Sequence, residues 1–174
     1  AISAQLQHVL DAFADTPAII KTPEWTVVAW NRAANAVLAD YGSIPLENRN
    51  VLRLLFIDRK RGHLPDWRAV ARLVIGTVRR DVMLAGANAQ TRALLAELER
   101  ESQEFRDMWA EQEVRPHGEG SKTIIHPDAG VLTLEYSTFA VDGRPDLALV
   151  VFNPATDADR MKVRRLIAAA DGTK

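Results

Sequence analysis

The sequence lacks cysteine, which excludes disulfide bonds, thiolate metal sites and cysteine nucleophiles and leaves the cellular compartment undetermined. It also lacks an excess of charge of either sign: 22 Lys and Arg residues stand against 23 Asp and Glu residues, a net charge of -1. Phosphate binding needs a clear positive excess. The balance therefore argues against a nucleic-acid surface formed by these residues alone, and the basic loop 58–65 is better interpreted as a solvated loop than as a phosphate contact.

Long hydrophobic runs are missing too, and no run approaches the roughly 20 residues of a membrane-spanning helix. What is present is the composition of a soluble globular protein, with 47% apolar and 26% charged residues among 174. This length predicts one domain that buries roughly 70% of the surface of its unfolded chain. Residues 1–13 begin without methionine and already have helical apolar spacing, so we expect that an N-terminal part has been removed.

The sequence also lacks recognisable catalytic and cofactor-binding motifs. The sequence contains no GxSxG elbow, HExxH motif, Walker motif or dinucleotide fingerprint, and residues 118–120 are too short and acidic to cradle a phosphate. The four histidines are His8, His63, His117 and His126. No pair has the spacing of a helical metal site, and His117 with His126 across neighbouring strands would still need a third ligand. We therefore expect no metal site.

Five runs of β-branched and alternating apolar residues predict strands. They are residues 18–21, 25–31, 122–126, 130–140 and 146–152. Thr22-Pro23-Glu24 predicts a hairpin turn between the first two runs. Asp142-Gly143 is the strongest hairpin signal and lies between the last two.

Between the second and third strands, apolar residues at helical spacing predict several helices, the strongest from Asp66 to about Met83. Asn31, Asn50 and Ser102 are the predicted N-caps. Two strands, a helical insert and three further strands predict an α+β fold with a PAS-like antiparallel five-stranded sheet and the insert packed on one face.

The predicted organisation has three parts. Residues 1–16 form a leading helix, residues 17–154 form the PAS-like domain, and residues 155–174 form a polar C-terminal tail. Within that tail, the basic patch 162–165 is expected to be helix-like and frayed.

The stretch His126-Pro127-Asp128-Ala129-Gly130 allows two interpretations. His126 and Asp128 could be the acid–base part of a hydrolytic site, but the sequence offers no activated nucleophile to accompany them. A turn explains every residue, because proline and aspartate suit the corners and Gly130 can take the left-handed conformation before the next strand. The turn is the favoured interpretation.

Aromatic residues make up only 6% of the chain, yet they gather on the apolar stripes of the predicted helices and strands. Such spacing is typical of plain core, but side chains from both sheet and helices could also enclose a ligand, with a few polar anchors. The pocket candidates are Trp30, Asn31, Phe56, Trp67, Val70, Val74, Arg79, Phe105, Arg106, Trp109, His126 and Leu134. The polar members also have simpler interpretations, such as a cap, a helix-end cation, a surface ion pair or a turn residue.

Six stretches in this order carry a family resemblance: PAIIKTPEWTVVAWNRAAN (17–35), NVLRLLF (50–56), VRR (78–80) at the end of the Trp67 helix, ELERESQEFRDMWAEQEV (97–114), KTIIHPDAGVLTLEY (122–136) and LALVVFNP (147–154). Together they resemble the ligand-binding domain of MmyB-like transcription regulators. By position, the resemblance implies anchors at Asn31, Phe56, Trp67, Arg79, Ser102, Phe105, Trp109, His126, Pro127 and Gly130, several of them fold determinants.

The resemblance implies a bacterial, cytoplasmic regulator in which this domain follows a helix-turn-helix of the XRE type. The domain would bind a fatty-acid-like molecule as its only bound group and would control DNA binding by the helix-turn-helix, which these residues do not include. An alternative is a ligand-free module that forms a homodimer through residues 2–13. A hydrolase using His126 and Asp128 is a remote third hypothesis, and we expect that the protein is not an enzyme.

Overall fold

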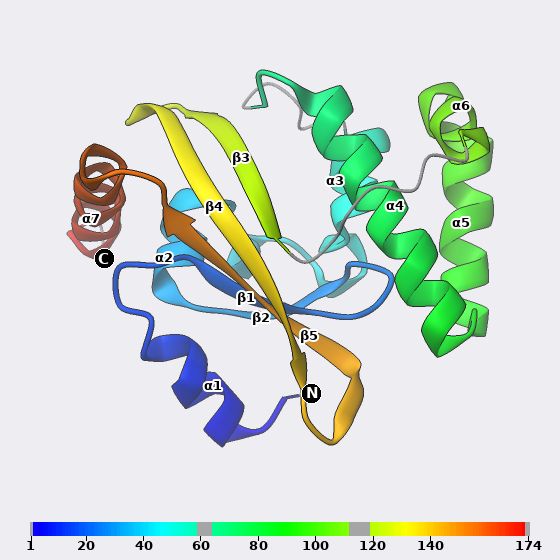
Figure 1. The fold of residues 1–174 in the computed structure, drawn as a ribbon, viewed down its shortest axis with the longest axis horizontal. Coiled ribbons are helices and arrows are strands. Elements are labelled where there is room, and N and C mark those ends of the chain that lie inside the picture. Colours follow the sequence, from blue (N-terminus) through cyan, green and yellow to red (C-terminus); the bar gives the residue numbers. More distant parts are fainter. Residues whose placement is uncertain (1, 59–63, 112–118, 173–174) are drawn as a thin grey trace.

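The computed structural model describes residues 2–58, 64–111 and 119–172. Its five strands form one antiparallel sheet in the order β2-β1-β5-β4-β3 (Figure 1). The strands are β1 Ala18–Lys21, β2 Val27–Trp30, β3 Glu119–His126, β4 Gly130–Val141 and β5 Arg144–Pro154. The α+β fold with a five-stranded antiparallel sheet is thus confirmed, and the helical insert joins the edge strand β2 to the opposite edge strand β3.

The helices largely follow the apolar periodicity of the sequence. Among the described residues they are α1 Ala4–Asp11, α2 Arg32–Val37, α3 Val51–Phe56, α4 Trp67–Ala85, α5 Ala89–Glu101, α6 Gln103–Ala110 and α7 Asp157–Asp171, with short 3-10 turns η1 Tyr41–Ser43 and η2 Leu46–Asn48. The predicted caps are confirmed: the side chains of Asn31, Asn50 and Ser102 accept backbone N–H groups at the starts of α2, α3 and α6.

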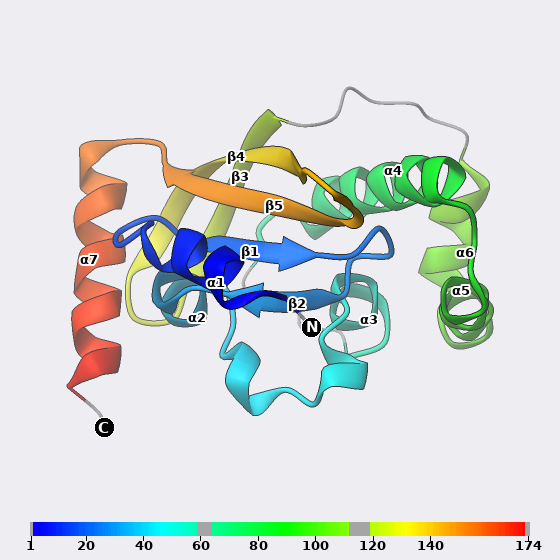
Figure 2. The ribbon, with the colours of Figure 1, turned by 90° about the horizontal axis from the view of Figure 1, so that it is seen from below.

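Alternation along the strands gives the sheet two apolar faces. Ile19 faces a core that also contains Val150 and side chains of α2 and α7. Ala18 and Ile20 face the other way, where Leu10 of α1 is fully buried. Figures 1 and 2 show α7 beside one end of the sheet and α4–α6 beyond the opposite end.

Helices α3–α6 have a separate core of their own. Phe56 and Phe105 are almost fully buried there, together with Val74 of α4 and Leu98 of α5. Lys21 at the end of β1 connects this helical core to the sheet: its ammonium lies 3.0 Å from a carboxylate oxygen of Asp81 in α4. Burial lowers the pKa of Lys21 from its ordinary value, and the Asp81 charge opposes that shift.

The C-terminal residues depart from the expectation of a frayed patch. They form α7, capped by Thr156, and Val163, Leu166 and Ile167 are buried in the core shared with α2. The apolar positions i, i+3 and i+4 lie between charged residues, and tertiary packing on α2 stabilises a helix that composition alone describes as polar.

The turns have the predicted conformation at two glycines, but one tryptophan that was expected in a strand lies in a turn. Gly130 and Gly143 have φ of 69° and 70°, the left-handed conformation that glycine adopts without a steric cost. Trp25, expected to begin the second strand, instead has φ of 64° and lies in the turn, so that β2 starts at Val27. Its amide donates to the carbonyl of Thr22 at 2.9 Å, which closes the turn.

Candidate functional site

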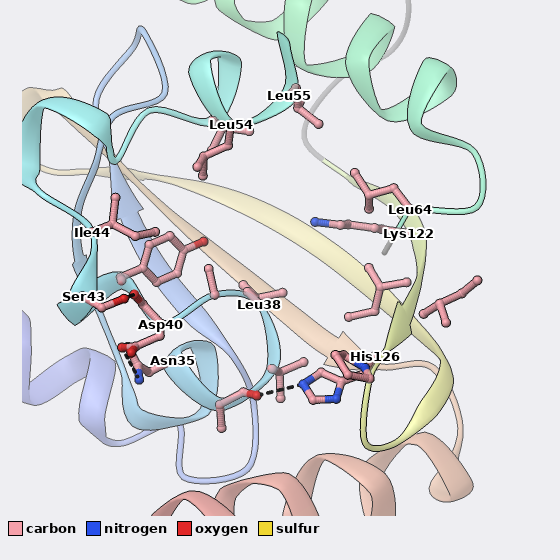
Figure 3. Close-up of a pocket in the computed structure, with 18 residues that line it drawn as sticks. Asn35, Leu38, Asp40, Ser43, Ile44, Leu54, Leu55, Leu64, Lys122 and His126 are labelled. Atoms are coloured by element: carbon pink, nitrogen blue, oxygen red, sulfur yellow. Dashed lines mark hydrogen bonds between the residues drawn. The ribbon is translucent and has the colours of Figure 1, made fainter. Parts of the chain in front are cut away.

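A cavity of about 380 Å³ lies between the edge strand β3 and the segment from α2 to α3. Figure 3 shows Leu38, Ile44 and Leu54 on the helical side and Lys122 with His126 on the strand side. The complete lining is Asn35, Ala36, Val37, Leu38, Ala39, Asp40, Tyr41, Ser43, Ile44, Val51, Leu54, Leu55, Leu64, Lys122, Ile124, Ile125, His126 and Pro127. The volume falls within the range of roughly 300–1,000 Å³ that small-molecule sites occupy.

Asn31 positions the helical wall of the cavity. Its side-chain oxygen accepts the amides of Ala34 at 2.8 Å and Ala18 at 3.0 Å, which starts α2 and ties it to β1. Its side-chain nitrogen lies 3.2, 2.9 and 2.8 Å from the carbonyls of Leu10, Phe13 and Thr16. One buried amide therefore joins the cavity wall to the end of α1, and its predicted role as a cap is confirmed.

Lys122 provides a cation in an otherwise mainly apolar wall. It is the only Lys or Arg among the described residues that line the cavity, and Figure 3 shows its nitrogen end directed toward the enclosed space. The Lys122 ammonium has no hydrogen bond or ion pair with another described residue, and the ring of Phe152 lies 5.6 Å away. Burial lowers the pKa of Lys122 to about 8 because the charged form loses hydration.

Tyr41 contributes a second polar group to the same space. Its side chain is 5% exposed, and its ring packs against Trp30 with the centroids 5.5 Å apart. Within the described part of the chain, the Tyr41 hydroxyl makes no hydrogen bond, although the residue lines the cavity. Burial raises the pKa of Tyr41, so the hydroxyl keeps its proton and remains a donor.

His126 closes the strand-side end of the cavity and uses both ring nitrogens. Its Nδ1 accepts the backbone amide of Asp128 at 3.1 Å, so the proton is assigned to Nε2, which lies 3.2 Å from the carbonyl of Ala36 in α2 (Figure 3). Asp128 thus contacts His126 through its main chain, and its carboxylate is not the orienting group of an acid–base pair. The favoured turn interpretation agrees with this geometry, since β3 pairs with β4 up to His126 and Gly130.

The aromatic pocket candidates gather elsewhere. Phe56, Trp67, Val70, Val74, Phe105 and Trp109 all belong to the core of α3–α6. The Phe56 ring centroid lies 5.3 Å from that of Phe105, which lies 5.4 Å from that of Trp109. The Arg79 guanidinium stacks 4.8 Å from the Trp109 ring centroid and donates to the carbonyls of Trp109 and Glu111. These residues form a packed cluster distinct from the cavity lining.

The remaining candidates have separate places in the fold. Arg106 is exposed and donates to Gln103 and to the carbonyl of Glu99 at the end of α5. Leu134 is fully buried on β4, and Trp30 packs at the margin of the same sheet core. Among the twelve candidates, the described cavity lining includes His126 alone.

Sequence reasoning missed Lys122 and Tyr41. Lys122 had a signal: it lies two residues before Ile124, a buried position, so alternation along the strand places it on the inner face. Tyr41 is buried in the 3-10 turn η1, which no pattern in the sequence predicted. Both residues could be recognised only once the cavity was known, because the apolar periodicity of a sequence does not reveal cavities.

Two other findings concern the described residues as a whole. None of the helices that the structure describes is long and apolar enough to cross a membrane. In the same part of the chain, no three His, Cys, Asp or Glu side chains are grouped so that they could hold a metal ion. His63 and His117 lie outside the described residues.

The comparison with known families agrees with the resemblance stated above. The family model described as MmyB-like transcription regulator ligand binding domain matches residues 2–166, which include every element from α1 to most of α7. The search of curated proteins found no match. Because the match covers nearly the whole chain, the chain belongs to the family of MmyB-like transcription regulator ligand-binding domains.

Proposed function

We propose that this domain senses an apolar, fatty-acid-like small molecule in the cavity between β3 and the α2–α3 segment. The observation that supports the proposal is the cavity itself: it has small-molecule size and aliphatic walls, and it lies in a domain whose family binds ligands in transcription regulators. The molecule would act as an effector of a bacterial, cytoplasmic regulator whose DNA-binding part is a helix-turn-helix of the XRE type.

Burial of an aliphatic chain supplies the affinity. Leu38, Ile44 and Leu54, which line the cavity, have purely aliphatic side chains. Each methylene that leaves water contributes about 0.8 kcal/mol before the costs of association, so a chain of about ten carbons provides roughly 8 kcal/mol of gross transfer free energy. The length of the ligand's aliphatic chain would therefore be limited by the volume of the cavity rather than by polar contacts along that chain.

The signal would leave the site through α2 and Asn31. Residues 35–39 line the cavity, and Asn31 at the other end of α2 contacts the carbonyl of Leu10 in the last turn of α1 and that of Phe13 just after it. A ligand that displaces α2 must move this hydrogen-bonded amide or strain its contacts. Residues 1–16 would then transmit the change from the PAS-like domain of residues 17–154 to the helix-turn-helix. Hydrogen exchange of the amides near Leu10 and Phe13, with and without ligand, measures this coupling.

Native mass spectrometry of the purified domain, before and after organic extraction, tests the binding function. We expect a co-purifying aliphatic molecule, or a rise in melting temperature when decanoic acid or decanol is added to the extracted domain. Decanoic acid suits the volume, which lies near the lower end of the range for ligand sites. The absence of a bound molecule together with no thermal shift for either compound contradicts the proposal.

A homodimer through α1 is a second proposed role, compatible with the first. Val9 is 48% exposed on this helix, so an apolar side chain is available beside the buried contact of Leu10 with the sheet. Light scattering on the domain and on the variant Val9→Glu tests whether α1 forms a dimer. A dimer that becomes monomeric in Val9→Glu, with decanoate binding unchanged, supports dimerisation as a separate property of the domain.

A further inference from the structure

Lys122 is an unusual residue for the wall of an apolar cavity. A buried or half-buried charge normally has an ion-pair partner, because the loss of hydration is costly without one. Lys21, which is 1% exposed, obeys this rule through Asp81, and Lys122 is half-buried. Lys122 has only the distant face of Phe152 among the described residues, and a ring at 5.6 Å is near the limit of a cation–π contact. Within the described ranges, the charge at Lys122 therefore lacks a strong partner.

The other polar side chains that line the cavity do not provide Lys122 with an ion-pair partner either. The Tyr41 hydroxyl and the Lys122 ammonium are both donors, and neither bonds to another described residue. His126 has no free nitrogen to offer, because one ring nitrogen accepts from Asp128 and the other lies against Ala36. The Asp40 carboxylate lines the cavity across from Lys122 in Figure 3 and is occupied by the Asn35 amide at 3.2 Å. Asn35 Oδ1 is a buried neutral acceptor in the same lining. Among the described residues, however, no negatively charged acceptor forms an ion pair with the Lys122 ammonium, Asp40 included.

We propose that Lys122, assisted by the hydroxyl of Tyr41, is the specificity-determining anchor for a single negative charge, so that the cavity selects free aliphatic carboxylic acids over their neutral alcohol, ester or amide counterparts. The inference rests on the proposed ligand-binding function. One cation matches one carboxylate, whereas the two charges of an alkyl phosphate would leave an uncompensated charge among Leu38, Leu54 and Ile124.

The lowered pKa of Lys122 fits this role. A pKa of about 8 means that the ammonium is charged near neutral pH but poorly solvated, so an incoming carboxylate replaces hydration that the protein has already removed. An ion pair formed in such surroundings is stronger than one on the surface, because the effective dielectric constant is lower. The aliphatic walls would hold the chain, and Lys122 would determine which head group is accepted.

Isothermal titration with a matched pair of ligands, decanoate and decanol, tests the inference on the wild-type domain, Lys122→Met and Tyr41→Phe. We expect wild type to prefer decanoate. Lys122→Met should weaken decanoate binding by about 10- to 100-fold, the usual value of a charged hydrogen bond, and leave decanol binding within about threefold. Tyr41→Phe should weaken decanoate binding by about 3- to 10-fold through the loss of one neutral donor.

Lys162→Met is the matched control, because it removes a lysine from α7 that donates to the carbonyl of Val131 and is not among the lining residues. Its decanoate affinity should equal that of wild type, and melting temperatures verify that all variants are folded. Equal binding of decanoate and decanol by wild type, or unchanged decanoate binding by Lys122→Met, overturns the inference while leaving the proposed function intact. Failure of wild type to bind either ligand overturns both.

Discussion

The core of α3–α6 and the cavity beside β3 are both apolar, but different side chains form them. The first is closed by aromatic rings, with Phe56, Phe105 and Trp109 in mutual contact. The second is surrounded by aliphatic residues such as Leu38 and Ile44 and contains a lysine that has no ion-pair partner among the described residues. Large rings that interlock fill space, whereas shorter branched side chains on separate elements leave a hollow. The aromatic cluster therefore explains stability, and the cavity with its half-buried charge is where we propose that the ligand binds.

The largest difference between the two regions should be seen in the free energy of unfolding when a large side chain in each is replaced by alanine. Phe105→Ala should lower the free energy of unfolding by about 3–5 kcal/mol, because it opens a cavity in a closed aromatic core. Leu38→Ala should cost only about 1–2 kcal/mol, since Leu38 already adjoins empty space. Urea unfolding measures both. Equal losses would mean that the cavity wall is as closely packed as the helical core.

The buried Lys21 and the half-buried Lys122 should respond in opposite directions to the same substitution. Lys21→Met leaves Asp81 without its buried partner and should lower the free energy of unfolding by about 1–3 kcal/mol, an effect that the neighbouring Arg80 moderates. Lys122→Met removes a charge that has no partner among the described residues. Because one pKa unit corresponds to about 1.4 kcal/mol and partial solvent contact reduces the effect, stability should rise by about 1–2 kcal/mol. A loss of stability in Lys122→Met would show that the ammonium is already compensated.

The pH dependence should distinguish the cavity from the helical core as well. The folded-state pKa of Lys122 is about 8, below the ordinary 10.5, so the unfolded chain binds the proton more tightly between these values. The wild-type domain should therefore gain stability relative to Lys122→Met as pH rises from about 8 toward 10.5.

Decanoate affinity should change in the opposite sense. It should be constant between about pH 6 and pH 8, where decanoate is ionised and Lys122 is charged, and then fall by up to tenfold per pH unit, because the anion requires the ammonium form. The Tyr41 hydroxyl stays protonated through this range, so it does not contribute to the fall. Titrations at pH 7 and pH 9 measure the change, with decanol as the ligand that should show none.

The smallest effect on stability is expected when the cavity is filled. Ile44→Trp should change the free energy of unfolding by less than about 1 kcal/mol, because the larger side chain can occupy existing space. It should nevertheless abolish decanoate binding. Trp109→Phe in the helical core is the comparison variant and should leave binding unchanged. Loss of binding in Trp109→Phe alone would place the ligand in the helical core.

Much of the fold could be predicted because its signals are local. The caps Asn31, Asn50 and Ser102 act within three residues, and Gly130 and Gly143 were predicted from the turns that they permit. The conformation of Trp25 and the full length of α7 were not predicted, because tertiary contacts decide them. Trp25 packs on the helical core in a left-handed conformation, and the patch 162–165, predicted to be helix-like but frayed, belongs to a longer helix that packs on α2. The site was harder to predict, since Lys122 and Tyr41 line the same cavity only once the insert has folded beside β3.

The most direct measurement is a crystal structure of the domain with decanoate. The account predicts an elongated ligand among Leu38, Ile44 and Leu54, with a carboxylate oxygen about 2.7–3.0 Å from the Lys122 ammonium. A ligand bound among Phe56, Phe105 and Trp109 instead, or one whose carboxylate points away from Lys122 into solvent, would contradict it.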